Sequence, residues 1–223
     1  MTISFPVHGF SLQLHENEFL EIIIENTTVF SDIIADFTHQ TNGDQGSLLI
    51  SSGDRIHIFE KTVEFITNPF DIDFSTSRLQ KKLLAETSSF ISEQYTENLA
   101  TLNQTMIDFW DSVLVSMPYN MKYDLSVDPS ILAKSYNVSL NDDSTTIVEH
   151  LINYIKVVHQ LLGKTVFIFL GIKQFLSQQE LVSFLDSVKY ENIFLANVSG
   201  YQSYSLPSEH LFIYDYDCCI IES

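Results

Sequence analysis

Residues 18–40, EFLEIIIENTTVFSDIIADFTHQ, decide the fold of this 223-residue chain. The first eight alternate between polar and apolar and then become continuously apolar, which is the pattern of a β-strand. A polar turn follows at 25–28, and Ile33, Ile34 and Phe37 then recur at helical spacing. A strand that leads through a short turn into a helix is the opening unit of an α/β fold.

Later segments repeat this α/β character. Residues 48–60, LLISSGDRIHIFE, predict a β-hairpin around Gly53. Residues 165–171, TVFIFLG, and 192–198, NIFLANV, are nearly continuous apolar segments, which are typical of buried parallel strands. A capping-box pattern predicts a helix between them, and residues 210–221, HLFIYDYDCCII, predict one or two further strands.

The middle of the chain has a different pattern. Residues 75–117 contain no Gly or Pro, and their apolar residues recur at helical spacing, so we expect one or two long helices ending before Pro118. A short helix is expected near 130–136. A strong helix is expected over 145–163, TTIVEHLINYIKVVHQLLG, with Gly163 closing it.

These patterns predict an α/β body formed by residues 1–74 and 164–223, with a helical insertion over 75–163. No segment approaches the ~18 uninterrupted apolar residues of a membrane span. The first residues show no secretion signal. Cys218 and Cys219 are adjacent, which is a poor geometry for a disulfide. We therefore expect a reduced, cytoplasmic protein.

The chain is strongly acidic. It has 11 basic and 29 acidic residues, a formal net charge of −18. This charge argues against simple non-specific binding to nucleic acid, because such binding depends on neutralising phosphates. All the basic residues lie within 55–189. Two interpretations remain open: ordinary solvated lysines on an acidic protein, or a basic surface that folding assembles.

No catalytic pattern is present in the sequence. The turn after the first strand, ENTTVFS at 25–31, lacks the Gly and Lys with which a P-loop binds phosphates. A G-x-S-x-G motif is absent, and the seven histidines show no tight metal-ligand spacing. The sequence therefore predicts no nucleotide cofactor and no enzymatic activity.

Two groups of side chains are candidates for binding. Arg78, Lys81 and Lys82 have the i, i+3, i+4 spacing of one helix face, which suits contact with DNA phosphates or simply solubility. The other group consists of oxygen-bearing residues near the end of the long helices, which suit Ca²⁺ or form a solvated acidic loop. Its members are Asp108, Asp111, Asn120, Asp124 and Asp128.

The order and spacing of the segments resemble the spacer-acquisition protein family of type II-A CRISPR systems, the Csn2 family in its short form. The resemblance covers most of the chain, although none of its motifs is a sharp catalytic signature. The segments that carry it are 22–40, PFDIDFS at 69–75, KSYNVSLNDDSTTIVEHLINYIKVVHQLLGK at 134–164, KTVFIFLGIKQFLSQQELVSFLDSV at 164–188, and EHLFIYDYD at 209–217.

This resemblance implies an α/β head similar to a P-loop ATPase without a functional nucleotide site, with an inserted α-helical leg. It further implies a non-enzymatic, ring-shaped homotetramer that binds double-stranded DNA ends without sequence preference. The implied partners are the CRISPR integrase proteins and the RNA-guided effector nuclease, with no membrane. The candidate DNA-binding residues are Arg78, Lys81, Lys82, Lys122, Lys134, Lys156 and Lys173.

The family also binds Ca²⁺ through acidic residues of the leg. Here the corresponding segment, SVLVSMPYNMKYDLSVDP at 112–129, has fewer acids than the family pattern, so calcium binding is weaker, relocated or lost. We carry over Asp124, Asp128 and Asp111 as the expected metal ligands. Two other functions stay open: a protein-interaction scaffold of the adaptation complex, and a nucleotide-dependent enzyme.

Overall fold

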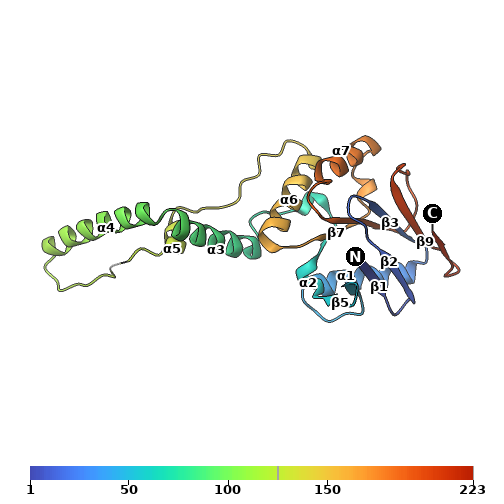
Figure 1. Cartoon of the computed structure of the whole chain (residues 1–223), viewed down its shortest axis with the longest axis horizontal. Helices are drawn as coiled ribbons and strands as arrows, with labels where there is room; N and C mark the ends of the chain where they lie inside the picture. The colour runs from blue at the N-terminus through green and yellow to red at the C-terminus, as the bar shows by residue number, and fades with distance from the viewer. Residues whose placement is uncertain (125, 223) are drawn as a thin grey trace. The chain divides into compact units, whose positions relative to one another are not determined.

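The computed structural model describes residues 1–124 and 126–222 (Figure 1). The chain forms two compact units. One consists of residues 1–73 and 142–223 and contains every strand, so we call it the sheet unit. The other, residues 74–141, is built from helices, and we call it the helical unit.

A six-stranded sheet is the centre of the sheet unit. Its strand order is β10-β9-β3-β8-β7-β6, and every neighbouring pair is parallel except β10 with β9. The strands are β3 (Phe19–Ile24), β6 (Val63–Ile66), β7 (Val166–Leu170), β8 (Phe194–Ser199), β9 (Glu209–Tyr214) and β10 (Ile220–Glu222). The α/β class and the predicted buried strands are thus confirmed. All six residues of β3 are buried, as its apolar sequence requires.

A second, antiparallel sheet packs on one face of the first. Its order is β2-β1-β4-β5, with β1 (Thr2–Phe5), β2 (Phe10–Gln13), β4 (Leu49–Ser52) and β5 (Arg55–His57). The predicted hairpin is β4–β5, whereas the sequence patterns did not predict the β1–β2 hairpin. Phe5 and Leu12 from this sheet meet Ile22 and Phe37 in the main hydrophobic core.

The described part of the sheet unit also contains the helices α1 (Thr27–Thr41), α2 (Phe59–Thr62), α6 (Ile147–Leu162) and α7 (Gln178–Val188), with the short 3-10 turns η1 (Pro69–Asp71) and η2 (Ile172–Gln174). Their ends follow the sequence signals. Thr146 and Glu149 form a capping box at the start of α6, and Gly163 ends it with a φ of 69°. Ser177 and Glu180 form the predicted capping box at the start of α7.

The second boundary between the units differs from the expected one. Residues 142–163, assigned from sequence to the helical insertion, belong to the sheet unit. The physical reason is the apolar face of α6, because Leu151, Ile155 and Val158 are fully buried there. The Tyr154 hydroxyl also donates a hydrogen bond of 2.5 Å to Glu64 on β6. A helical pattern shows that a face is apolar, but not which body it covers.

The helical unit contains α3 (Ser77–Gln94), α4 (Thr96–Ser116) and α5 (Pro129–Ser135), close to the predicted helices. α3 and α5 pack together, with Leu79 and Ala133 buried. α4 has no buried residue along its 21 positions. Among the described residues, no helix has the length and apolar character needed to cross a membrane.

Candidate functional site

Five of the seven predicted DNA-binding residues lie in the helical unit. Arg78, Lys81 and Lys82 are exposed on α3, and Lys134 is exposed on α5. Lys122 is exposed in the segment that joins α4 to α5. Folding therefore keeps these charges in contact with solvent, as binding to a phosphate backbone requires.

The three basic residues of α3 share one face of that helix. Leu79, between Arg78 and Lys81 in sequence, is fully buried, so the side of α3 next to these residues packs toward the interior of the unit. Residues three and four positions apart are neighbours on a helix surface, so the three positive charges lie within little more than one turn. We call Arg78, Lys81 and Lys82 the basic face of α3.

The net charge is divided unevenly between the two units. The helical unit has five basic and seven acidic residues, a formal charge of −2, whereas the sheet unit has six basic and 22 acidic residues, a charge of −16. A polyanion is therefore repelled by the sheet unit much more strongly than by the helical unit. The basic face of α3 therefore lies on the unit that repels phosphate groups less strongly.

Lys173 and Lys156 have different surroundings. The Lys173 side chain is only 3% exposed, and its Nζ lies 2.6 Å from Glu209 Oε2 and 3.1 Å from Glu21 Oε2. Its charge is thus neutralised inside the protein, so Lys173 is not part of the proposed DNA-binding surface. Lys156 is partly exposed on α6 of the sheet unit and pairs with Glu191 at 3.3 Å.

Lys173 belongs to a buried polar cluster that no sequence pattern predicted. Glu21 Oε1 accepts hydrogen bonds from Asn197 Nδ2 at 2.9 Å and from Ser199 Oγ at 3.1 Å. Burial raises the pKa of Glu21, although the charge of Lys173 and these hydrogen bonds act in the opposite direction. The one available signal was a glutamate inside an apolar strand, which requires a buried partner.

The turn between β3 and α1 occupies the position of a phosphate-binding loop, but it caps its own helix. The side-chain oxygen of Asn26 accepts hydrogen bonds from the backbone N–H groups of Thr28 at 3.1 Å and Val29 at 3.2 Å. These are the donors that a helix N-terminus offers to an anion. Residues 25–31 also contain no basic side chain, so this turn is not arranged to hold a phosphate.

The expected calcium ligands do not form one group. Asp111 accepts a hydrogen bond of 2.7 Å from the Tyr123 hydroxyl, which raises the pKa of Tyr123. Asp128 caps α5 by accepting a 2.7 Å hydrogen bond from the Ser130 backbone, and its hydrogen bonds with Ser130 lower the pKa of Asp128. Within residues 1–124 and 126–222, no three His, Cys, Asp or Glu side chains gather as metal ligands.

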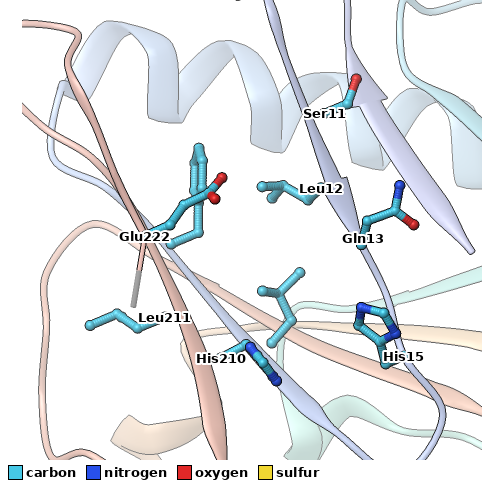
Figure 2. Close-up of a pocket in the computed structure, with 9 residues that line it drawn as sticks. Ser11, Leu12, Gln13, His15, His210, Leu211 and Glu222 are labelled. Atoms are coloured by element: carbon cyan, nitrogen blue, oxygen red, sulfur yellow. The ribbon is translucent and has the colours of Figure 1, made fainter.

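A pocket of about 430 Å³ opens between β2 and the β9–β10 hairpin (Figure 2). Leu12, Leu20 and Phe212 provide apolar walls, and the rings of His15 and His210 lie 6.2 Å apart. The polar side chains of β2 are already bonded within the sheet, since Ser11 donates to Ser4 Oγ and Gln13 donates to Thr2 Oγ1. We assign the pocket no catalytic role.

The comparisons with known proteins give one family. The model of a CRISPR-associated protein family, Cas_Csn2, matches residues 40–218, which include the whole helical unit and most of the sheet unit. No curated protein matches the chain. A solved structure described as an ABC transporter ATP-binding protein from Pyrococcus furiosus aligns over 91% of this chain and 88% of its own, with 10% identity and a TM-score of 0.38. A likeness at that level bears on neither fold nor function.

Proposed function

Because the chain belongs to the CRISPR-associated Csn2 family, we propose that it binds double-stranded DNA ends during acquisition of new CRISPR spacers. It acts without catalysis and without sequence preference, as a ring-shaped homotetramer beside the integrase proteins and the RNA-guided nuclease. The observation that carries this proposal is the basic face of α3, three exposed positive charges on one side of one helix. Contacts from these side chains would go to phosphates, which carry no sequence information.

The charge distribution between the two units supports binding of DNA at a single surface, the basic face of α3. The sheet unit, with its charge of −16, repels DNA from most of its surface. In a ring, basic faces from several copies point into one opening and add their potentials, while the acidic exterior keeps DNA out of other positions. A free DNA end can enter such an opening, whereas a closed circle cannot.

The exposed apolar surface of α4 supports assembly. Phe109, Trp110 and Met106 are exposed on this helix, and none of its 21 residues is buried. A helix that packs this little against its own chain is marginal in water, and a large exposed apolar surface marks an interaction site. A second copy of the chain covers this surface in the proposed homotetramer.

Calcium binding through Asp124, Asp128 and Asp111 stays a prediction. Asp111 and Asp128 already accept hydrogen bonds from Tyr123 and Ser130, and the described residues provide no three-ligand group. Hard cations such as Ca²⁺ take six to eight oxygen ligands. The described acidic residues of one chain bring together fewer ligands than such a site needs.

The test reverses two charges on the basic face of α3. We expect Arg78→Glu with Lys82→Glu to weaken binding of labelled linear duplex DNA at least about tenfold, because two phosphate contacts become repulsive. Fluorescence anisotropy measures the affinity and circular dichroism checks that α3 stays folded. The matched control, Arg55→Glu with Lys61→Glu, makes the same charge change on exposed residues of the sheet unit. Equal losses in both variants would contradict a specific DNA surface on α3.

Competition with unlabelled DNA tests the threading of ends. Linear duplex should displace the labelled DNA well and closed circular DNA poorly. Equal competition by the two DNA forms would show that DNA binds by ordinary surface electrostatics and not by threading of ends. Failure of the labelled DNA to bind at all would favour the second candidate, a protein-interaction scaffold, for which the exposed apolar face of α4 is the supporting observation.

A further inference from the structure

The edge of the six-stranded sheet at β10 is open and apolar. β10 pairs only with β9, and nothing in the described part of the chain pairs with its outer edge. Ile220 and Ile221 point to opposite faces and are 48% and 53% exposed. An edge strand with apolar side chains on both faces is a template for pairing with another strand.

The other strand edges differ from β10 in their side chains and burial. β6, at the opposite edge of the same sheet, is largely buried. In the smaller sheet, β5 is as short as β10 and carries the charged Arg55 beside Ile56, which is 65% exposed, and β2 directs polar Ser11 and Gln13 outward. β10 contains no Lys, Arg or Pro, residues that commonly protect an edge, and its one charged residue is Glu222.

The core is also incompletely covered beside β10. Glu222 and its β9 neighbour Phe212 both line the pocket of about 430 Å³ (Figure 2). Ile220 pairs with Tyr214, and the Tyr214 side chain belongs to the main hydrophobic core. Paired residues share a face of the sheet, so Ile220 extends this core face to the edge without a covering element.

We propose that β10 pairs with β10 of a second copy of this chain, antiparallel and about a two-fold axis at Ile221. The two six-stranded sheets then form one continuous sheet across the pair. Antiparallel pairing of residues 220–222 about Ile221 places each Glu222 opposite Ile220 of the other copy. Like charges directly opposite each other destabilise a strand pair, and this register avoids them. The two Ile221 side chains meet at the axis.

This inference specifies one interface of the homotetramer in the proposed function. It rests on that proposal only in expecting more than one copy of the chain per particle. A closed particle of four two-fold-related copies needs two different self-complementary interfaces. The structure offers one on each unit: the apolar face of α4 on the helical unit and β10 on the sheet unit.

The salt concentration should affect association through β10 and binding to DNA in opposite directions. Two sheet units of charge −16 repel each other, and added salt screens that repulsion. Association through β10 should therefore strengthen as salt rises, while binding to DNA weakens.

The first test places a charge at the two-fold axis. Ile221→Lys should halve the particle mass measured by light scattering, since two lysines would face each other there. The control, Ile56→Lys, alters an exposed isoleucine on β5 and should leave the mass unchanged. An unchanged mass in a folded Ile221→Lys protein would overturn the interface. A monomeric wild-type protein would overturn both the interface and the homotetramer, while DNA binding measured on the same sample would show whether the rest of the proposed function stands.

The second test traps the pair covalently. In a protein carrying Cys218→Ser and Cys219→Ser, Ile221→Cys places two thiols directly opposite each other, with Cβ atoms about 4.5–5.5 Å apart and within a small adjustment of disulfide geometry. Oxidised glutathione takes up the two electrons and two protons and leaves as two reduced molecules. We expect a disulfide-linked dimer on a non-reducing gel. No more dimer than with Ile56→Cys in the same background would contradict the proposal.

Discussion

At the residue scale, the buried Lys173 shows how the sheet unit stabilises charge inside an apolar core. Its ammonium group contacts Glu21 and Glu209 and also donates a 2.9 Å hydrogen bond to the Tyr204 carbonyl. Burial raises the pKa of Glu21, while the charge of Lys173 and the hydrogen bonds to Glu21 act in the opposite direction. Burial and the charges of Glu21 and Glu209 likewise raise the pKa of Tyr204 to about 12. The cluster ties β3 and β9 to the segment after β7.

Removing the cation should destabilise the sheet unit. We expect Lys173→Met to lower the free energy of unfolding by about 3–5 kcal/mol, because two buried carboxylates lose their common partner. Urea unfolding followed by circular dichroism measures the change.

Adding Glu21→Gln to this variant should recover part of the loss, since one of the two buried charges is then removed. The loss should also be smaller at pH 5 than at pH 7, because the raised pKa lets Glu21 take up a proton as the pH falls. A loss that is the same at both pH values and is not relieved by Glu21→Gln would show that lost packing, and not charge, is responsible.

At the scale of secondary-structure elements, α4 and α6 have similar sequence patterns but different surroundings. Both are amphipathic helices of at least 16 residues. α6 buries Leu151, Tyr154, Ile155 and Val158 in the sheet unit, while no residue of α4 is fully buried in its own chain. Most of the stability of a helix comes from packing of its apolar face. α4 therefore depends on a partner in a way that α6 does not.

Hydrogen exchange should distinguish the two helices. We expect the amides of α6 to remain protected at every protein concentration, because their packing is intramolecular. The amides of α4 should exchange at least about tenfold faster after dilution into the dissociated state, where its apolar face loses its cover. Exchange detected by mass spectrometry at high and low concentration measures this. Equal protection of both helices in the monomer would show that α4 is stable by itself.

At the scale of the whole molecule, the division of charge between the units determines where DNA can bind. A total of −18 conceals a helical unit of −2 and a sheet unit of −16. Each phosphate contact releases condensed counterions, so the salt dependence of affinity counts the contacts.

Neutralising two contacts should reduce that salt dependence. We expect Arg78→Ala with Lys82→Ala to lower the slope of log affinity against log salt concentration by about 2, close to 0.9 for each lost phosphate contact. Arg55→Ala with Lys61→Ala should leave the slope unchanged. Anisotropy titrations between low and physiological salt measure both slopes. A slope that Arg78→Ala with Lys82→Ala does not change would place the phosphate contacts elsewhere.

The sequence alone determined the local structure of this protein. The apolar β3 and β7, the capping boxes at Thr146 and Ser177 and the helical spacing over 75–117 depend on neighbouring residues, so their patterns are visible in the sequence. Only the tertiary structure decided which charges face solvent. Lys82 and Lys173 are the same residue type, yet one is exposed and the other is paired inside the core, because Glu21 and Glu209 are distant from Lys173 in sequence and meet it only when β3, β7 and β9 assemble. The placement of α6 with the sheet and the open edge at β10 were decided in the same way, by contacts between segments far apart in the chain.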